Sequence, residues 1–345
     1  MQRVEISEKL FEGAVSIEEA EGGWKPWRLP HTHRALFPSP DDALIARAEN
    51  SSGVRLRFET DSRTIALQVE VDDAVSPVTG RDAFVFDATV EGEIVGSVPV
   101  KPGDTDVVFE GLPDGGKTVE VWLPQDSSVV LRSLEVEEGA SFEVNDDPRP
   151  KWVTYGSSLT HCVRAHSPAQ TWPAIIARQY GLNLTALGFG GQCCLDPMLG
   201  MVIRDLPADI ITMKLGINCI GAGHLSVRTY PANAIGLVRI IREAHPDTPM
   251  VLVSPIGHPP TESTPNAVNY TISDMRRDLK DAKERLVSAG DENLYHANGL
   301  DVFSVAEIEE WTTDQCHPEA DGMALMAENF DRAVMKPYLP AEFSR

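Results

Sequence analysis

Positive charge is scarce in this chain of 345 residues, which has 30 Lys and Arg against 52 Asp and Glu and a formal net charge of −22. Nucleic acids and anionic membranes are bound through basic patches, and no such patch is visible, so neither is an expected partner. No run approaches the roughly 20 apolar residues that cross a bilayer. The opening sequence, MQRVEISEKLFEG, lacks a positively charged stretch followed by an apolar one, so we expect a cytoplasmic protein.

Cysteine is also scarce, and its spacing argues against two kinds of small scaffold. The five cysteines are an odd number and include no Cys-x-x-Cys pair, so neither a disulfide framework nor a zinc knuckle is indicated. We expect no metal and no cofactor. All five lie in the second half of the chain, at Cys162, Cys193, Cys194, Cys219 and Cys316.

From about Val54 to Val136 the chain consists of short alternating segments such as VRLRFET, TIALQVEV and TVEVWLP. Turn sequences such as SSG, KPGDT and PDGGK separate them. Alternation of apolar and polar residues is typical of half-buried strands, and the pattern predicts an antiparallel β-sandwich, in the manner of a jelly roll. This half contains no catalytic pair and is expected to be a structural or interaction module. An alternative is a binding edge formed by Trp24, Trp27, His31 and His33.

The acidic, proline-bearing segment GASFEVNDDPRP, residues 139–150, is expected to be a linker, which predicts one domain over residues 1–148 and another over 149–345. After it, short apolar segments such as DIITMKLG and MVLVSPI alternate with longer helical patterns. Apolar strands bounded by Gly and polar loops suit a parallel sheet covered by helices on both faces. Active sites of such sheets form at the carboxyl ends of the strands.

Four of these strand ends and loops carry unusual polar residues. They are Gly156-Ser157-Ser158, Gly188-Phe189-Gly190-Gly191, Gly216-Ile217-Asn218 and Asp314-Gln315-Cys316-His317. Taken singly, each has an ordinary structural explanation, because serines cap helices, glycines form turns and asparagines satisfy backbone groups.

Together and in this order, the four blocks resemble the GDSL or SGNH family of serine esterases and acyltransferases. That family's signatures are Gly-Asp-Ser, a Gly in the second loop, Gly-x-Asn-Asp and Asp-x-x-His. The resemblance extends over about residues 152–339 and implies a three-layer α/β/α, flavodoxin-like catalytic domain. The first half resembles the accessory β-sandwich that precedes the catalytic domain in some members.

The resemblance implies a role for each block. Ser158 stands in the nucleophile position, and a serine hydroxyl needs a base such as His317 to take its proton. Asp314 can present its carboxylate to the Nδ1–H group of His317 and stabilise the imidazolium. By the family pattern the oxyanion formed on attack is bound by the backbone N–H groups of Ser158 and Gly191 and the side-chain amide of Asn218.

Several positions depart from the family pattern or leave alternatives open. Ser157 stands where the family has Asp, Cys162 where a Gly often follows, and Cys219 where Gly-x-Asn-Asp ends in Asp. Ser157 is the alternative nucleophile, and a structural pair of serines without catalysis is the other reading. A metal site formed by Cys162, His161, Cys316 and His317 is an alternative too, although their spacing lacks the local ligand pairs that zinc sites favour. His161 and His166 lie near Ser158 but have no carboxylate at a fixed short spacing.

The sequence favours a serine carboxylester hydrolase that acts through an acyl-enzyme on small-acyl or carbohydrate-type esters, with a small-molecule ester as its partner. An acyltransferase with the same acyl-enzyme is the first alternative, and a noncatalytic binding protein is the second. Candidates to line the pocket are Tyr155, Trp172, Leu195, Met198, Ile220, His224, Pro259 and Pro260, most of which are expected to pack in the core or in loops. No signal for an oligomeric state is present.

Overall fold

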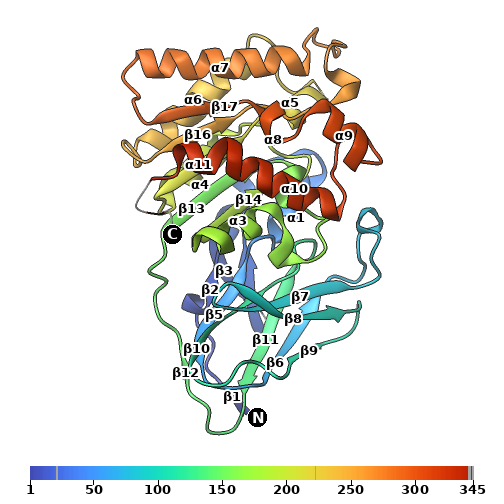
Figure 1. The fold of residues 1–345 in the computed structure, drawn as a ribbon, viewed down its shortest axis with the longest axis vertical. Coiled ribbons are helices and arrows are strands. Elements are labelled where there is room, and N and C mark those ends of the chain that lie inside the picture. Colours follow the sequence, from blue (N-terminus) through green and yellow to red (C-terminus); the bar gives the residue numbers. More distant parts are fainter. Residues whose placement is uncertain (21, 222, 341–342, 344–345) are drawn as a thin grey trace. The chain divides into compact units, whose positions relative to one another are not determined.

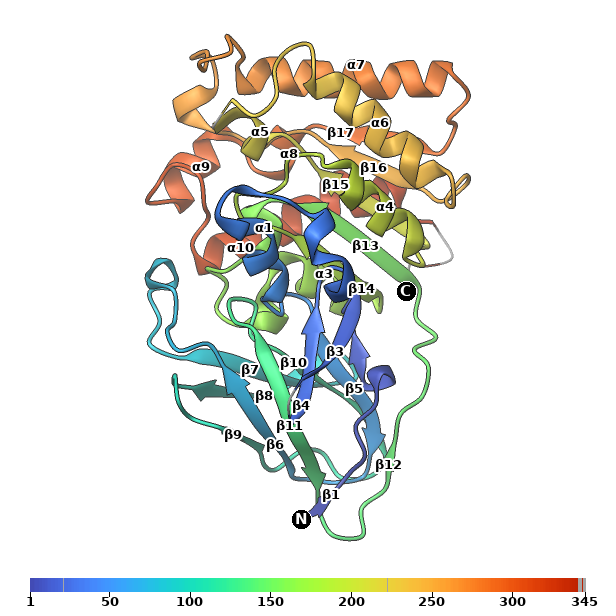
Figure 2. The same cartoon turned by 180° about the vertical axis from the view of Figure 1, so that it is seen from behind.

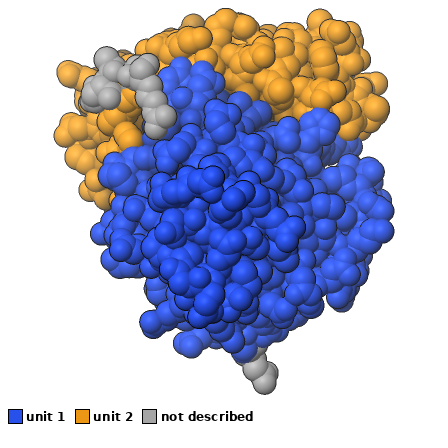
Figure 3. Space-filling view, turned by 60° about the horizontal axis from the view of Figure 1, so that its bottom comes forward, with its two compact units in different colours: residues 1–149, 163–186 blue, residues 150–162, 187–345 orange. Residues whose placement is uncertain are grey.

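The computed structural model describes residues 1–20, 22–221, 223–340 and 343 (Figure 1). The chain divides into two compact units, which are coloured separately in Figure 3. The first contains residues 1–149 and 163–186, and the second contains residues 150–162 and 187–345. The predicted boundary at residues 148 and 149 stays a prediction, and the compact units add that residues 163–186 cluster with the β-rich part.

The first unit contains two antiparallel sheets of six strands each (Figure 2). One has the order β3-β4-β11-β6-β9, with β1 paired to β11, and the other has the order β12-β5-β10-β7-β8, with β2 paired to β5. The strands of the first sheet are β1 (Gln2–Arg3), β3 (Ser16–Ala20), β4 (Gly23–Trp27), β6 (Ile65–Val71), β9 (Asp106–Phe109) and β11 (Val129–Val136). Those of the second are β2 (Phe11–Glu12), β5 (Arg55–Thr60), β7 (Phe84–Val90), β8 (Glu93–Val100), β10 (Lys117–Trp122) and β12 (Phe142–Glu143).

Alternation along the strands builds the core of this sandwich. In β6, Ile65, Leu67 and Val69 are buried while the residues between them are more exposed. They join a single apolar cluster with residues of the other sheet, among them Phe58 and Val119. The predicted β-sandwich is confirmed. Strands β1 to β4 lie before Val54, where the sequence showed no regular alternation.

Trp27, one of the residues considered for a binding edge, is packed inside the first unit. Its side chain is 1% exposed, and its indole N–H donates to Glu18 Oε2 over 2.8 Å. Lys25 and Arg34 lie over its ring. A ligand therefore has no access to this ring, although the neighbouring Trp24 remains half-buried.

Hydrogen bonds explain why residues 163–186 belong to the first unit. The backbone N–H of Ala169 donates to Asp87 Oδ2 over 2.9 Å, and Arg178 Nη1 donates to the Gly92 carbonyl over 2.8 Å. The helices of this unit are α1 (Ala43–Glu49), α3 (Trp172–Tyr180) and the short 3₁₀ helices η1 (Glu8–Leu10), η2 (His31–Leu36), η3 (Pro40–Asp42), η4 (Pro77–Thr79) and η5 (Pro168–Gln170). The segment expected to be a linker contains β12, which pairs with β5.

The third sheet of the chain is parallel and has five strands in the order β14-β13-β15-β16-β17, and the predicted order of strands and helices is confirmed. The strands are β13 (Lys151–Gly156), β14 (Asn183–Gly188), β15 (Ile210–Lys214), β16 (Met250–Val253) and β17 (Leu294–Ala297). The helices are α2 (Ser158–His161), α4 (Pro197–Asp205), α5 (Ile217–Gly221), α6 (Tyr230–Arg242), α7 (Ile272–Ser288), α8 (Gly299–Val302), α9 (Val305–Trp311), α10 (Ala320–Phe330) and α11 (Lys336–Tyr338), with the 3₁₀ turn η6 (Pro259–Thr261) and the π-helical segment η7 (Asp331–Met335).

Helices cover both faces of this sheet, so every residue of β15 and β16 is buried (Figure 1). On one face the ring of Phe330 in α10 lies 6.3 Å from that of Trp152 in β13. On the other face, α6 packs against both α4 and α7. None of the helices in the described part of the chain has the length and apolarity needed to span a bilayer.

Lys214, the last residue of β15, carries an ammonium group into this core. The residue is 4% exposed, and no ion pair of its side chain is found within the described residues. Burial lowers the pKa of Lys214 from 10.5 to about 8. Between these two values the unfolded chain holds more protons than the folded one, so stability from this group rises with pH across that window and is at its lowest below pH 8.

We therefore expect Lys214→Met to increase the free energy of unfolding by about 2 kcal/mol at pH 7, because it removes a buried charge that has no counter-ion. The gain should shrink as the pH rises from 8 to 10.5. Urea unfolding at pH 7 and pH 9.5 measures both effects. The exposed Lys280 provides the matched control, since Lys280→Met should show no such pH dependence. A destabilised Lys214→Met protein at pH 7 would contradict the prediction.

Candidate active site

Ser157 and Ser158 lie at the carboxyl end of β13, where the chain turns into α2. Ser157 is the N-cap residue of this short helix and is fully buried, and its hydroxyl accepts a hydrogen bond from the Leu159 N–H over 3.4 Å. Ser158 is the first residue of the helix and is half-buried. The two adjacent serines therefore differ: one hydroxyl is occupied by a cap, and the other is accessible.

The backbone packs unusually closely beside this turn. A Cβ atom added to Gly188, at the end of β14, would lie 2.2 Å from the backbone N of His161 and 2.4 Å from the carbonyl carbon of Thr160. The N–H of the next residue, Phe189, donates to the Gly156 carbonyl over 2.9 Å. The loop after β14 is therefore held directly against α2, and only glycine fits at its start.

A chain of hydrogen bonds joins Ser158, His317 and Asp314. Ser158 Oγ lies 2.8 Å from His317 Nε2, and His317 Nδ1 lies 2.8 Å from Asp314 Oδ2. Because an ionised carboxylate only accepts hydrogen bonds, Nδ1 carries the proton and Nε2 of the neutral ring is left to accept from the Ser158 hydroxyl. Ser158 is thus joined through one continuous set of hydrogen bonds to two residues that follow it by more than 150 positions.

The Asp314 carboxylate is held ionised by its surroundings. Its Oδ1 accepts hydrogen bonds from the backbone N–H of His317 over 2.8 Å and from that of Cys316 over 3.0 Å. Burial favours the neutral acid, but these bonds and the adjacent imidazole outweigh it and lower the pKa of Asp314 to about 2. The bridge between Thr312 and Pro318 closes the loop that carries these residues.

The structure links Asn218 to the loop that carries Gly191. Asn218 lies in α5, directly after β15, and its Oδ1 accepts the backbone N–H of Cys193 over 3.0 Å. This bond identifies the amide oxygen, so Nδ2 is the group left to donate elsewhere. Gly191 has φ +76, and a Cβ atom added to it would lie more than 4 Å from any neighbouring atom. Among the described residues, no acceptor contacts the backbone N–H of Gly191 or of Ser158.

His258 is a residue near this site that the sequence reasoning missed. It lies in the loop after β16, is half-buried, and has Nδ1 2.7 Å from Thr261 Oγ1. Burial lowers its pKa, and the electrostatic influence of His317 and Asp314 also reaches it. A histidine after a strand end has no distinctive pattern of its own, although the neighbouring Pro259 and Pro260 were among the candidates to line a pocket.

The cysteines near the site do not assemble into a metal centre. Within the described ranges, no group of three or more His, Cys, Asp or Glu side chains is arranged to hold an ion. Cys316 Sγ lies 4.0 Å from His317 Nε2, and Cys194 Sγ lies 3.2 Å from His224 Nδ1. Of the other candidates to line a pocket, Trp172 is fully buried in α3 of the first unit.

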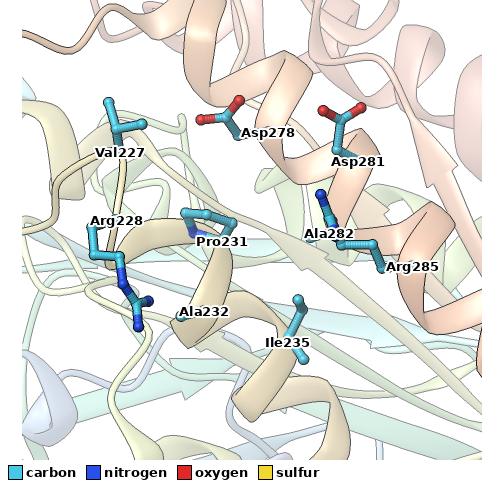
Figure 4. A pocket seen from close by; sticks show the side chains of 9 residues that line it. All are labelled: Val227, Arg228, Pro231, Ala232, Ile235, Asp278, Asp281, Ala282 and Arg285. Carbon is cyan, nitrogen blue, oxygen red and sulfur yellow. The ribbon is translucent and has the colours of Figure 1, made fainter.

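A separate hollow of about 410 Å³ lies between α6 and α7 (Figure 4). Its lining combines apolar with charged side chains, from Val227, Arg228, Pro231, Ala232, Ile235, Asp278, Asp281, Ala282 and Arg285. None of the predicted site residues belongs to it. We take as the candidate site the hydrogen-bonded residues at the carboxyl ends of β13 and β15, together with the loop that carries Asp314 and His317.

Comparisons with known families match both halves of the chain. Residues 10–132 match the family described as the N-terminal domain of SsfX3, and residues 150–335 match the GDSL-like lipase/acylhydrolase family. Among curated proteins, no sequence matches the chain.

Solved structures match over nearly the whole length. The structure described as the salicylyl-acyltransferase SsfX3 from a tetracycline biosynthetic pathway is 33% identical, with a TM-score of 0.89 and 98% of each chain covered. A structure described as that of a GDSL-like lipase from Bacteroides ovatus is 21% identical, with a TM-score of 0.74 and 95% of each chain covered. A family two carbohydrate esterase from Clostridium thermocellum is 12% identical, with a TM-score of 0.64 over 94% of this chain and 98% of that one. The last two likenesses concern the fold alone.

The close contact at Gly188 generates a stability prediction. Gly188→Ala should lower the free energy of unfolding by at least about 2 kcal/mol, because its methyl group would meet backbone atoms that cannot rotate away. Gly236, in the middle of α6, is the matched control, since an added Cβ meets nothing within 4 Å there. Gly236→Ala should stabilise by up to about 1 kcal/mol through its helix propensity. Thermal unfolding of both variants measures the difference, and equal effects would contradict the prediction.

Proposed function

Because the chain belongs to the GDSL-like lipase/acylhydrolase family, we propose that it is a serine carboxylester hydrolase with Ser158 as nucleophile, His317 as general base and Asp314 as the acid that orients it. The observation that carries the proposal is the 2.8 Å distance between Ser158 Oγ and His317 Nε2. A hydroxyl becomes a competent nucleophile when a base accepts its proton during attack.

In the proposed reaction, Ser158 Oγ bonds to the carbonyl carbon of the ester while its proton passes to His317 Nε2. The Asp314 carboxylate, which remains ionised down to about pH 2, stabilises the imidazolium that forms. The tetrahedral intermediate collapses, and the alcohol leaves with the proton from Nε2. Water then attacks the acyl-enzyme by the same proton transfers in reverse, and the carboxylic acid is released.

The proposed oxyanion hole consists of the backbone N–H groups of Ser158 and Gly191 and the side-chain amide of Asn218. Two features support it: the N–H groups of Ser158 and Gly191 have no acceptor among the described residues, and the Asn218 oxygen is already engaged by Cys193. Unengaged donors near a nucleophile are suited to stabilise negative charge as it develops.

For the substrate, we propose a small-acyl or carbohydrate-type ester. The residues assigned to the proposed site or found near His317 are polar or small: Asn218, His258, Cys316 and Gly191. Such groups match a polar alcohol better than a long hydrocarbon chain, which would need an extended apolar surface.

Acyl transfer is the second proposed activity, and one observation favours it. The 33% identity over 98% of the chain is to a structure described as a salicylyl-acyltransferase. Both reactions form the same acyl-enzyme on Ser158, and they differ only in whether water or an alcohol attacks it. In the transferase the alcohol would give its proton to His317 Nε2 and carry away the acyl group.

Single substitutions of the two serines test the nucleophile. Ser158→Ala should reduce turnover of p-nitrophenyl acetate by at least about 10³-fold, as loss of a nucleophile does in serine hydrolases. Ser157→Ala is the matched control: it should cost about 1 kcal/mol of stability through the lost helix cap and keep most of the turnover. If Ser158→Ala retained full activity, or if Ser157→Ala were the inactive variant, the proposed mechanism would be wrong.

A series of p-nitrophenyl esters tests the substrate and the type of reaction. For a small-acyl site, kcat/KM should fall steeply from acetyl to octanoyl, because each added methylene lacks an apolar contact to compensate for its crowding. An added p-nitrophenyl benzoate extends the series to an aromatic acyl group. Sugar and phenol acceptors are then included, and the products are separated by mass. Transesterified product would favour the transferase, and a flat or rising acyl series would overturn the small-acyl proposal.

A further inference from the structure

The peptide groups of Cys193 are held on both sides by two consecutive residues of α5. The N–H of Cys193 donates to Asn218 Oδ1 over 3.0 Å, and its carbonyl oxygen lies 3.6 Å from Cys219 Sγ. Cys193 and Cys219 are 1% and 0% exposed, so water does not compete for these bonds. Cys193 follows Gly191 by two positions, and the contacts therefore join the loop of Gly191 to the helix of Asn218.

In the second contact the thiol is necessarily the donor. A carbonyl oxygen can only accept, so the hydrogen lies on Cys219 Sγ. Burial raises the pKa of Cys219 well above 9.0, and the group remains a neutral S–H at ordinary pH. An ionised aspartate, which stands at this position in the family pattern, could not donate to the Cys193 carbonyl. This chain thus has a neutral donor where the family pattern has an acid.

We propose that Cys219 is a positioning residue for the oxyanion hole, which together with Asn218 clamps Cys193 and so fixes the Gly191 loop relative to the Asn218 amide. The inference rests on the proposed function and adds to it a residue that does not itself touch the substrate. Cys193 supplies the clamped backbone groups. Its own side chain faces other partners, the Lys214 carbonyl at 3.8 Å and the Tyr155 side chain.

The two bonds to Cys193, from here on called the clamp, act on two hydrogen-bond donors: the Asn218 amide and the Gly191 N–H. The bond from the Cys193 N–H fixes which way the Asn218 amide points, because that N–H can pair with the oxygen but not with the NH₂ group. The bond from Cys219 prevents the Cys193 peptide from rotating away and releasing Asn218. The same restraint limits the movement of Gly191, which has φ +76 and lies in the turn closed by the Gln192 N–H on the Phe189 carbonyl over 3.0 Å. Stabilisation of an oxyanion depends on such donors being in place before the charge forms.

Cys219→Ala tests the clamp, with hydrolysis of p-nitrophenyl acetate and binding of a methylboronic acid, which forms a tetrahedral adduct on serine, as the two readouts. We expect kcat to fall about 3- to 10-fold, as loss of one neutral hydrogen bond predicts, with KM unchanged. The boronate affinity should fall by a similar factor, because the adduct needs the same donors. Cys219→Ser retains a donor and should recover at least about half of the wild-type kcat.

Cys193→Ala is the comparison that separates positioning from packing. It removes an equally buried thiol but keeps both clamped backbone groups, so it should lower the unfolding temperature about as much as Cys219→Ala while lowering kcat less. Equal losses of kcat in the two variants would overturn the proposal, as would wild-type kcat in Cys219→Ala. If Cys219→Ala does not fold, wild-type boronate affinity with lowered kcat in Cys219→Ser would overturn it instead. Failure of the hydrolase proposal is recognised separately, as full activity of Ser158→Ala.

Discussion

The parallel hydrogen bonding of β13 with β15 is the constraint on which the candidate site depends. Tyr155 lies opposite Met213, so the two strands end at the same edge and their following turns begin side by side. Ser158 comes from one turn and Asn218 from the other. A shift of register by one residue would turn each strand residue to the opposite face of the sheet and separate the two side chains. The loop of Asp314 and His317 then completes an arrangement whose foundation is backbone pairing.

Two buried charges, those of Glu120 and Lys214, are compensated differently. In the first unit, the Glu120 carboxylate accepts a hydrogen bond from Arg55 Nε over 2.8 Å. It also forms an ion pair with Arg149, which in turn forms one with Asp147. Burial would raise the pKa of Glu120, but the two guanidinium groups outweigh it and hold the pKa below its ordinary value. In the second unit the ammonium of Lys214 has no such partner among the described residues, so burial prevails and its pKa falls. Mutual pairing is what allows several ionised groups to remain in the interior of the β-sandwich.

Near the proposed active site, one carboxylate is held ionised and two buried thiols are held neutral. Asp314 keeps its charge because backbone N–H groups and an imidazole surround it. Cys193 and Cys219 are buried thiols whose pKa values burial raises, so they add no negative charge beside the proposed oxyanion hole. The Asp314 carboxylate lies behind the imidazole, where it is placed to stabilise the positive charge that forms on the ring.

Local pattern was sufficient to predict most of the fold. Alternation of apolar and polar residues along segments such as residues 64–71 identified the antiparallel strands, because only one face of such a strand is buried. Continuous apolar runs identified β13 to β17, because both faces of these strands are buried. Strands β1 to β4 were not predicted because they are short or interrupted by turns. Segments of two to five residues are too short to show a regular alternation of apolar and polar residues. The motifs around Ser158, Asn218 and His317 were sufficient to select candidate residues through their resemblance to a family.

Tertiary structure decided what depends on contacts between distant residues. That Ser157 caps α2 while Ser158 meets His317 cannot be read from two adjacent serines, since both have the same local sequence signal. The clustering of residues 163–186 with the β-rich unit depends on hydrogen bonds such as that from Ala169 to Asp87. The sequence could show Cys219 only as a departure from a pattern. Its bond to Cys193 exists because folding brings two loops together across the end of a parallel sheet, and that proximity has no local signature in the chain.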